Sequence, residues 1–242
     1  MGKPVRLGML TPSSNTVLEP ITQAMLVDLS GVSAHFSRFR VTEISLALPA
    51  LDQFDNRALL EAAQLLADAK VDVIAWNGTS AGWLGLEQDR QLCQQIMAAT
   101  GIPATTSVLA LQEIFEGLNI TRFGLVTPYI EDVQAKIIAN FAHQGFHCVA
   151  EQHLNLRVNL SFAEVDAEKI TALVYQVAQA QPQAITTFCT NLGAAPLVPE
   201  LEKHTGIPIF DTVTVAVWKS LRLAGVDTSL VKGWGRLFAD LP

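Results

Sequence analysis

One cysteine stands where a reacting group could be placed. Cys189 follows a short apolar run and precedes Thr190, Asn191 and a helix pattern that begins at about Pro196. A thiol near a helix N-terminus has its thiolate stabilised by the helix dipole and by free N–H groups. That setting suits proton transfer or nucleophilic attack. The alternative, equally common for a free cysteine, is a small buried hydrophobe.

A glycine and two hydroxyl residues form a second candidate group. Gly78, Thr79 and Ser80 lie at a predicted strand-to-helix turn. Their hydroxyls and backbone N–H groups could hold a carboxylate or an enolate oxygen, with Gly78 allowing a close approach. The plainer interpretation is that Thr79 and Ser80 cap the next helix and Gly78 permits a tight turn. Both roles can coexist.

Four further polar residues follow predicted strands or lie in loops. Ser13 and Asn15 come directly after the first strand, in a stretch that is typical of a helix cap. Tyr129 follows a strand of the second half and could donate a hydrogen bond to a ligand. Asn159 lies in a loop and could be only a turn residue.

The chain contains two copies of one unit. The segment 6–12, RLGMLTP, reappears as 122–128, RFGLVTP, and the segment 100–103, TGIP, reappears as 205–208. Aligning the copies places Gly78 opposite Cys189 and Ser13 opposite Tyr129. We therefore expect two halves related by a pseudo-twofold axis, with equivalent loops facing each other across an active site.

Short apolar runs alternate with amphipathic segments in each half, which predicts an α/β fold with two short parallel sheets flanked by helices. The predicted boundaries are 1–118 for the first half, 119–223 for the second and 224–242 for a C-terminal tail that packs back on the core. The predicted strands are 5–10, 32–39, 71–76, 102–106, 123–126, 146–151, 184–188 and 207–210. The predicted helices are 15–29, 56–70, one ending at 96, 108–117, 131–143, 161–180, 196–204 and 212–223. The predicted helix 161–180 starts with a capping box that runs from Ser161 to Glu164.

Composition excludes several classes of function. The 242 residues carry a net charge of −7 with no basic run, which argues against a nucleic-acid partner. No apolar stretch approaches the roughly 18 residues of a membrane span, and we predict a cytoplasmic protein. The three cysteines show no CxxC spacing and the five histidines form no cluster, so we expect no metal site and no disulfide framework. Exposed helices in such folds often pair between two copies of a chain, so a homo-oligomer remains one of the alternatives.

Taken together, the repeat, the stretch 12–16 (PSSNT), Gly78-Thr79-Ser80, Tyr129 and Cys189 resemble the aspartate/glutamate racemase superfamily. Within it, the chain is similar to the branch of maleate cis–trans isomerases and arylmalonate decarboxylases, over essentially its whole length. The resemblance implies a cofactor-independent enzyme acting on a small carboxylate substrate. It also implies that Asn15 and Asn159 help to hold carboxylates, as in maleate isomerases.

The chain departs from the pattern of this family at one position. Racemases and isomerases of this type carry one cysteine in each half, whereas Gly78 occupies the first position here, as in arylmalonate decarboxylases. Two-base racemisation needs an acid on both faces of the α-carbon, so it is disfavoured. Decarboxylation needs one acid, Cys189, with the enediolate held by Thr79, Ser80, Tyr129 and backbone N–H groups near Thr190. Asn191 completes the predicted substrate-binding set.

Two alternatives stay open at this stage. In the first, Cys189 acts as the nucleophile of a maleate-type isomerisation, which Asn15 and Asn159 favour. In the second, the chain is a catalytically silent carboxylate-binding protein. Pocket specificity is expected to depend on the loop 41–55 and on Trp83, while Trp76 and Trp83 either pack the core or enclose an aromatic substrate.

Overall fold

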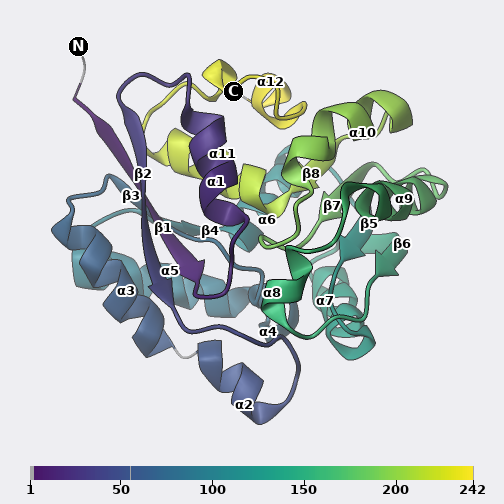
Figure 1. Cartoon of the computed structure of the whole chain (residues 1–242), viewed down its shortest axis with the longest axis horizontal. Helices are drawn as coiled ribbons and strands as arrows, with labels where there is room; N and C mark the ends of the chain where they lie inside the picture. Colours follow the sequence, from purple (N-terminus) through teal and green to yellow (C-terminus); the bar gives the residue numbers. More distant parts are fainter. Residues whose placement is uncertain (1–2, 55, 242) are drawn as a thin grey trace.

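The computed structural model describes residues 3–54 and 56–241. It contains two parallel four-stranded sheets, each with helices packed against it (Figure 1). The first sheet has the order β2-β1-β3-β4 and the second the order β6-β5-β7-β8, so both halves have the same topology. The predicted fold class is confirmed.

The bounds of the elements follow the alternation of apolar and amphipathic segments. The strands are β1 Val5–Pro12, β2 Val32–Phe39, β3 Val73–Trp76, β4 Ala104–Thr106, β5 Arg122–Thr127, β6 His147–His153, β7 Ala184–Thr187 and β8 Ile209–Asp211. The first-half helices are α1 Leu18–Leu26, α2 Leu48–Leu51, η1 Asp52–Phe54, α3 Asn56–Asp68, α4 Ala81–Leu84, α5 Leu86–Thr100 and α6 Ser107–Gly117. The others are α7 Glu131–His143, α8 Asn159–Phe162, α9 Ala167–Ala178, η2 Ala195–Leu197, α10 Val198–Thr205, α11 Thr212–Leu223, η3 Thr228–Leu230 and α12 Leu237–Asp240.

The repeat extends to single hydrogen bonds at the strand ends. β1 pairs with β3 in parallel register, and the N–H of Asn77 donates to the carbonyl of Leu10 at 3.1 Å. In the second half β5 pairs with β7, and the N–H of Phe188 donates to the carbonyl of Val126 at 2.8 Å. Gly78 and Cys189 are each the next residue along the chain, so the two halves place them at equivalent positions.

The two halves share one hydrophobic core. A single cluster of buried side chains includes Leu7 and Met9 of β1 as well as Phe123 and Leu125 of β5. Helix α6 packs against α11, and α4 packs against α7, so each contact joins one half to the other. Burial of this much apolar surface fixes how the halves face each other, and the strand ends of both converge on the interface.

The last segment of the chain lies on the second half's helix α11 and on the shared core. Leu237 and Phe238 of α12 are buried in it, and the indole N–H of Trp218 donates to the carbonyl of Leu241 at 2.6 Å. Figure 1 shows α12 beside α11, close to the C-terminus.

One predicted helix is wrong. The capping-box sequence predicts a single helix from Ser161, whereas the chain makes one turn, α8, and starts again at α9. Asp166 caps α9, because its carboxylate accepts from the N–H of Lys169 at 2.6 Å. Ser161 instead donates its hydroxyl to the carbonyl of Val158. A stronger cap five residues later therefore takes the helix start.

The first predicted helix starts later than its pattern indicates. Asn15 lies outside α1, and its Oδ1 accepts from the N–H groups of Val17 at 3.0 Å and Leu18 at 2.9 Å. It therefore satisfies free N–H groups at the start of the helix, as a capping side chain does.

Candidate active site

The ends of three of the four central strands (β1, β3, β7) and Tyr129 just after β5 line one cavity between the halves. The cavity brings together seven of the residues predicted from the sequence, namely Gly78, Thr79, Ser80, Tyr129, Asn159, Cys189 and Thr190. The other lining residues, called the apolar wall below, are Pro12, Val41, Ile44, Phe54, Trp76 and Trp83. The lining thus combines a polar set with an apolar set, at the carboxyl edge where parallel sheets bind ligands.

The cavity is narrow. Its volume is about 20 Å³, room for about one water molecule, so a dicarboxylate can enter only if lining residues separate. The segment 40–54 covers it and is tied to the second half by the Ile44 N–H, which donates to the carbonyl of Arg157 at 2.9 Å. The predicted specificity loop therefore supplies Val41, Ile44 and Phe54 to the wall; its last residue, Asp55, lies outside the described residues.

Cys189 is a protonated thiol in this setting. Its side chain is 2 % exposed, and burial raises the pKa of the thiol to about 12. Hydrogen bonds from the Tyr129 hydroxyl and from the N–H groups of Asn191 and Leu192 act in the opposite direction on this pKa but do not offset burial. At neutral pH the group is therefore a potential proton donor rather than a thiolate.

The predicted N–H groups are present, since those of Asn191 and Leu192 lower the pKa of the thiol, but the predicted helix N-terminus does not lie beside Cys189. Residues 190–194 form turns, and the first helical turn, η2, starts only at Ala195. The dipole effect acts within about one turn of a helix end, whereas desolvation acts directly on the buried sulfur.

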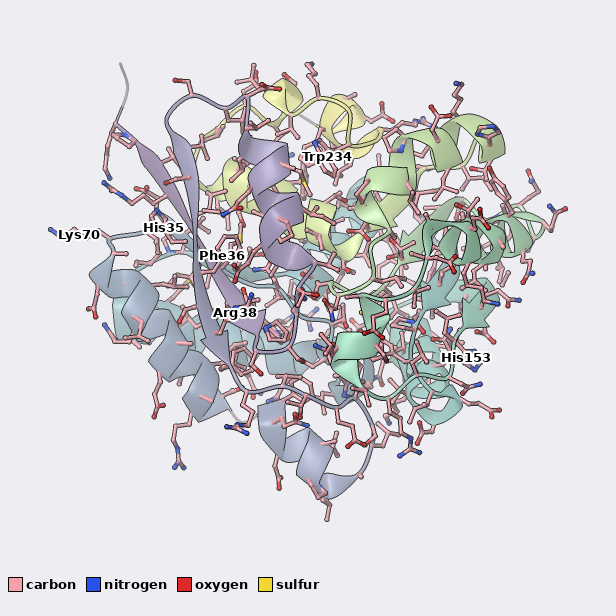
Figure 2. The ribbon with its side chains drawn as sticks, in the orientation of Figure 1. His35, Phe36, Arg38, Lys70, His153 and Trp234 are labelled. Carbon is pink, nitrogen blue, oxygen red and sulfur yellow. The ribbon has the colours of Figure 1, made fainter. Side chains whose placement is uncertain are left out.

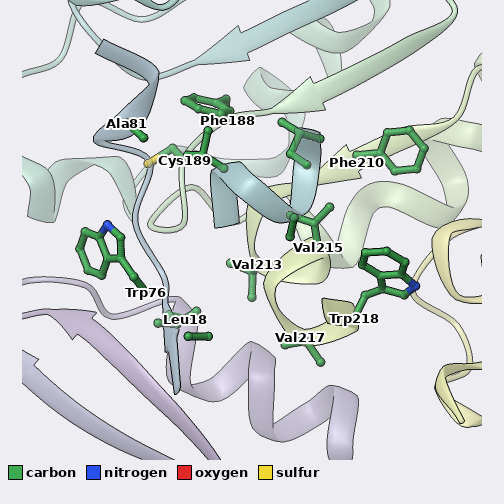
Figure 3. Close-up of a cluster of buried hydrophobic side chains, with 14 of the residues drawn as sticks. Leu18, Trp76, Ala81, Phe188, Cys189, Phe210, Val213, Val215, Val217 and Trp218 are labelled. Carbon is green, nitrogen blue, oxygen red and sulfur yellow. The ribbon is translucent and has the colours of Figure 1, made fainter. Parts of the chain in front are cut away.

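Trp76 fills the space in front of Gly78. A Cβ atom added to Gly78 would overlap Cζ2, Cε2 and Cη2 of the Trp76 ring. Trp76 is 1 % exposed and packs against Phe39, with ring centroids 5.0 Å apart. The first-half position thus has no side chain, and an indole occupies the volume that a side chain there would need. Figure 3 shows this ring and Cys189 within the same buried cluster.

Thr79 and Tyr129 form a hydroxyl pair across the interface. Their oxygens are 2.6 Å apart, and both residues are buried. Burial, together with the neighbouring Cys189, raises the pKa of Tyr129 well above its ordinary value, so the phenol is a neutral hydrogen-bond donor. Ser80 precedes α4, makes no capping hydrogen bond through its side chain, and lines the cavity.

Three predicted binding residues lie behind the cavity wall rather than on it. Asn15 donates through Nδ2 to the Thr190 hydroxyl at 3.2 Å, and Thr190 donates to the carbonyl of Asn77 at 3.0 Å. Asn191 accepts from the N–H of Thr16 at 3.0 Å. Ser13 donates to the carbonyl of Val41 at 3.3 Å and accepts from that residue's N–H at 3.1 Å.

The bonds of Asn15, Thr190 and Asn191 join the two halves beside the cavity. The side-chain oxygen of Asn15 accepts two backbone N–H groups and its Nδ2 donates to Thr190, so this side chain bonds within the protein. Asn159 does line the cavity, and its Nδ2 donates to the Ser14 hydroxyl at 2.8 Å, while its carbonyl accepts from Asn191 at 2.6 Å.

Sequence reasoning missed the role of the Trp76 ring and of Asp211. Asp211 ends β8 and caps α11 through the N–H of Val213 at 2.8 Å, and it accepts from the Thr187 hydroxyl at 2.7 Å. Burial raises its pKa to about 7, and its charge in turn raises the pKa of Cys189. The Asp-Thr-x-Thr cap pattern at 211–214 was the available signal for it.

Other hollows and titratable residues do not form a competing site. A hollow of about 340 Å³ beside Leu241 contains none of the strand-end residues. Within residues 3–54 and 56–241, no three His, Cys, Asp or Glu side chains are grouped as metal ligands, and no helix is long and apolar enough to cross a membrane. Figure 2 shows His35 and His153 far apart, on different halves.

A sequence model of arylmalonate decarboxylase matches residues 19–238, nearly the whole chain. The chain belongs to the arylmalonate decarboxylase family. Arylmalonate decarboxylase of Bordetella bronchiseptica is 27% identical over 186 residues, covering 76% of this chain and 78% of that protein. Maleate isomerase of Nocardia farcinica is 28% identical over 242 residues, covering 96% and 94%.

The comparison with solved structures also finds an arylmalonate decarboxylase and maleate isomerases. A mutant of Nocardia farcinica maleate cis-trans isomerase with a covalently bound succinylcysteine intermediate superposes with a TM-score of 0.88 at 25% identity, over 98% of this chain and 99% of that one. The predicted resemblance is therefore confirmed: this member of the arylmalonate decarboxylase family is an arylmalonate decarboxylase-like or maleate isomerase-like enzyme.

Proposed function

We propose that the protein decarboxylates a malonate-type dicarboxylate without a cofactor and that Cys189 protonates the resulting enediolate. The observation that carries this proposal is the asymmetry of the cavity. Cys189 faces it from the second half, whereas Gly78 has no side chain and the Trp76 ring fills the equivalent space. One acid on one face is sufficient for decarboxylation and insufficient for two-base racemisation.

The polar and the apolar lining residues contact different carboxylates of the substrate. The carboxylate that stays lies against Thr79, Ser80, Tyr129 and the backbone N–H groups near Thr190, which stabilise the charge that develops on its oxygens. The carboxylate that leaves lies against the apolar wall formed with Val41. Desolvation there favours loss of neutral CO2.

The chemical step is balanced without any further reagent. The bond between the α-carbon and the departing carboxylate breaks, CO2 leaves, and the electron pair remains in an enediolate. The Sγ–H proton of Cys189 then transfers to the α-carbon, giving the monoacid and a thiolate. Water returns a proton to the thiolate before the next turnover. The raised pKa of Cys189, about 12, suits the first transfer because the thiol holds its proton at neutral pH.

A second candidate is isomerisation of a maleate-type substrate with Cys189 as the nucleophile. Two observations favour it: the match to maleate isomerase over 96% of the chain, and the presence of Asn159 on the cavity. Attack requires the thiolate, however, and burial holds Cys189 in its thiol form. Asn15, the other predicted carboxylate ligand, is used inside the protein.

The test is turnover of phenylmalonate, methylmalonate, maleate, and L- and D-aspartate by the wild type and by Cys189→Ala. We expect CO2 release from a malonate by the wild type, and a loss of at least 10²-fold in the variant, since a placed proton donor contributes about 10²–10⁴-fold. Cys93→Ala is the matched control, because Cys93 is also buried but does not line the cavity. Retained activity in Cys189→Ala would refute the assignment, and fumarate from maleate alone would support the second candidate.

A further inference from the structure

Two donors on the apolar wall of the cavity have no hydrogen-bond partner among residues 3–54 and 56–241. They are Nε1 of Trp76 and Nε1 of Trp83, both buried. The indole of Trp218, by contrast, has its partner at the carbonyl of Leu241. Buried donors are nearly always paired, and an unpaired one costs free energy. A pair of them on one cavity therefore points to an acceptor that arrives with the substrate.

The position of the Trp76 N–H is fixed by its contact with Gly78. The ring atoms that a Cβ at Gly78 would overlap include Cε2, the carbon bonded to Nε1. The benzo edge of the indole around Cζ2, next to the carbon that carries Nε1, therefore lies at the first-half position that is equivalent to Cys189. In Figure 3 the indole nitrogen is on the edge of the ring that is turned toward Cys189.

The chemistry of this group limits what it can bind. An indole N–H donates a hydrogen bond, accepts none and does not transfer its proton at neutral pH. A bond to the departing carboxylate would stabilise the ground state and slow the reaction. The carboxylate that stays is held by Thr79, Ser80 and Tyr129 in the proposed function. The remaining acceptor is a neutral oxygen attached to the reacting carbon.

We propose that Trp76 is a specificity-determining residue whose indole N–H binds an oxygen substituent on the reacting carbon. The substrate class is then a malonate with an α-hydroxyl or α-alkoxy group. This inference rests on the proposed function and deepens it, because it names the group that the apolar wall recognises. It assigns to Trp76 a binding role at the position where related racemases and isomerases place a second cysteine.

The test compares two malonates of nearly equal size, tartronate with an α-hydroxyl and methylmalonate with an α-methyl. The ratio of their kcat/KM values is measured in the wild type and in Trp76→Phe, so that the intrinsic reactivity of each acid cancels. We expect the variant to lower the preference for tartronate about tenfold, the effect of one hydrogen bond in a dry site. Trp234→Phe is the matched control, since Trp234 does not line the cavity, and it should leave the ratio unchanged.

A second measurement keeps Trp76 in place. In ¹⁵N-labelled Cys189→Ala protein saturated with tartronate, the Trp76 indole proton should move downfield, while those of Trp218 and Trp234 stay. An unchanged ratio in Trp76→Phe, or an unmoved Trp76 resonance when tartronate is bound, would overturn the inference while leaving decarboxylation intact. If the wild type neither binds nor decarboxylates either malonate, the proposed function fails and this inference with it.

Discussion

Gly78→Cys would place a second thiol opposite Cys189, and the structure predicts what this costs. The new Cβ overlaps three atoms of the Trp76 ring, so the indole has to move within a close-packed wall. Overpacking of this kind costs about 1–3 kcal/mol. For a chain of this length 1 kcal/mol corresponds to about 2–4 °C in Tm, so the expected loss is about 2–12 °C.

Thermal and urea unfolding of four proteins measure this cost: wild type, Gly78→Cys, Trp76→Leu and the double variant. Trp76→Leu removes the overlapping ring edge, so adding Gly78→Cys in that background should cost less than about 1 kcal/mol. Gly117→Ala is the control, because a Cβ at Gly117 meets nothing within 4 Å. It should be neutral or slightly stabilising.

Activity provides the second readout of the same variants. With thiols on both faces, the double variant should exchange the α-proton of α-substituted acids with D2O and racemise them, and Gly78→Cys alone should do so less. If Gly78→Cys were as stable as the wild type, or cost the same in both backgrounds, Trp76 would not fill the first-half position. Absence of any racemisation in both variants would weaken the assignment of Gly78 as the missing acid's position.

Three further predictions follow from the site. Tyr129→Phe removes the hydroxyl that lies 2.6 Å from the Thr79 hydroxyl and should lower kcat about 10²-fold. Circular dichroism should show that the fold is retained. An unchanged kcat would show that Tyr129 does not stabilise the enediolate. Since burial raises the pKa of Cys189 to about 12, kcat/KM should not rise between pH 7 and 9, whereas a nucleophilic thiolate would give nearly a tenfold rise per pH unit. Burial raises the pKa of Asp211 from 3.8 to about 7, so between these pH values the folded state holds a proton that the unfolded state releases. The free energy of unfolding measured in urea should therefore fall as pH rises from about 4 to 7. Burial raises the pKa of Asp89 to about 7 as well, so Asp211→Asn should reduce that fall without abolishing it, and an unaltered slope would contradict this origin.

Most of the fold could be predicted because each half contains the same alternation of apolar strands and amphipathic helices. The internal repeat also gave the correct pairing of Gly78 with Cys189, since both directly follow residues whose N–H groups bond to the neighbouring strand. The helix predicted from Ser161 was wrong because Asp166 is a better cap, and one pattern could not rank the two competing starts.

The site was only partly predictable because burial and side-chain direction arise from the packing of the two halves. Sequence position placed Cys189 near a helix, yet the desolvation that controls its pKa depends on side chains from both halves. The same holds for Trp76, since its ring direction relative to Gly78 is set by Phe39 and by the core around it. Asn15 was expected to contact a ligand and instead joins the halves through Thr190.

The central claim is that Cys189 delivers a proton to the α-carbon after CO2 leaves. Proton NMR of a malonate turned over in D2O tests it most directly, with the wild type beside Cys189→Ala. The account predicts a monoacid that carries one deuterium at the α-carbon, enriched in one enantiomer, and a rate at least about 10²-fold lower in the variant. Any of three results would contradict it. These are a racemic monoacid, an equal rate in Cys189→Ala, and fumarate without deuterium as the sole product from the substrate panel.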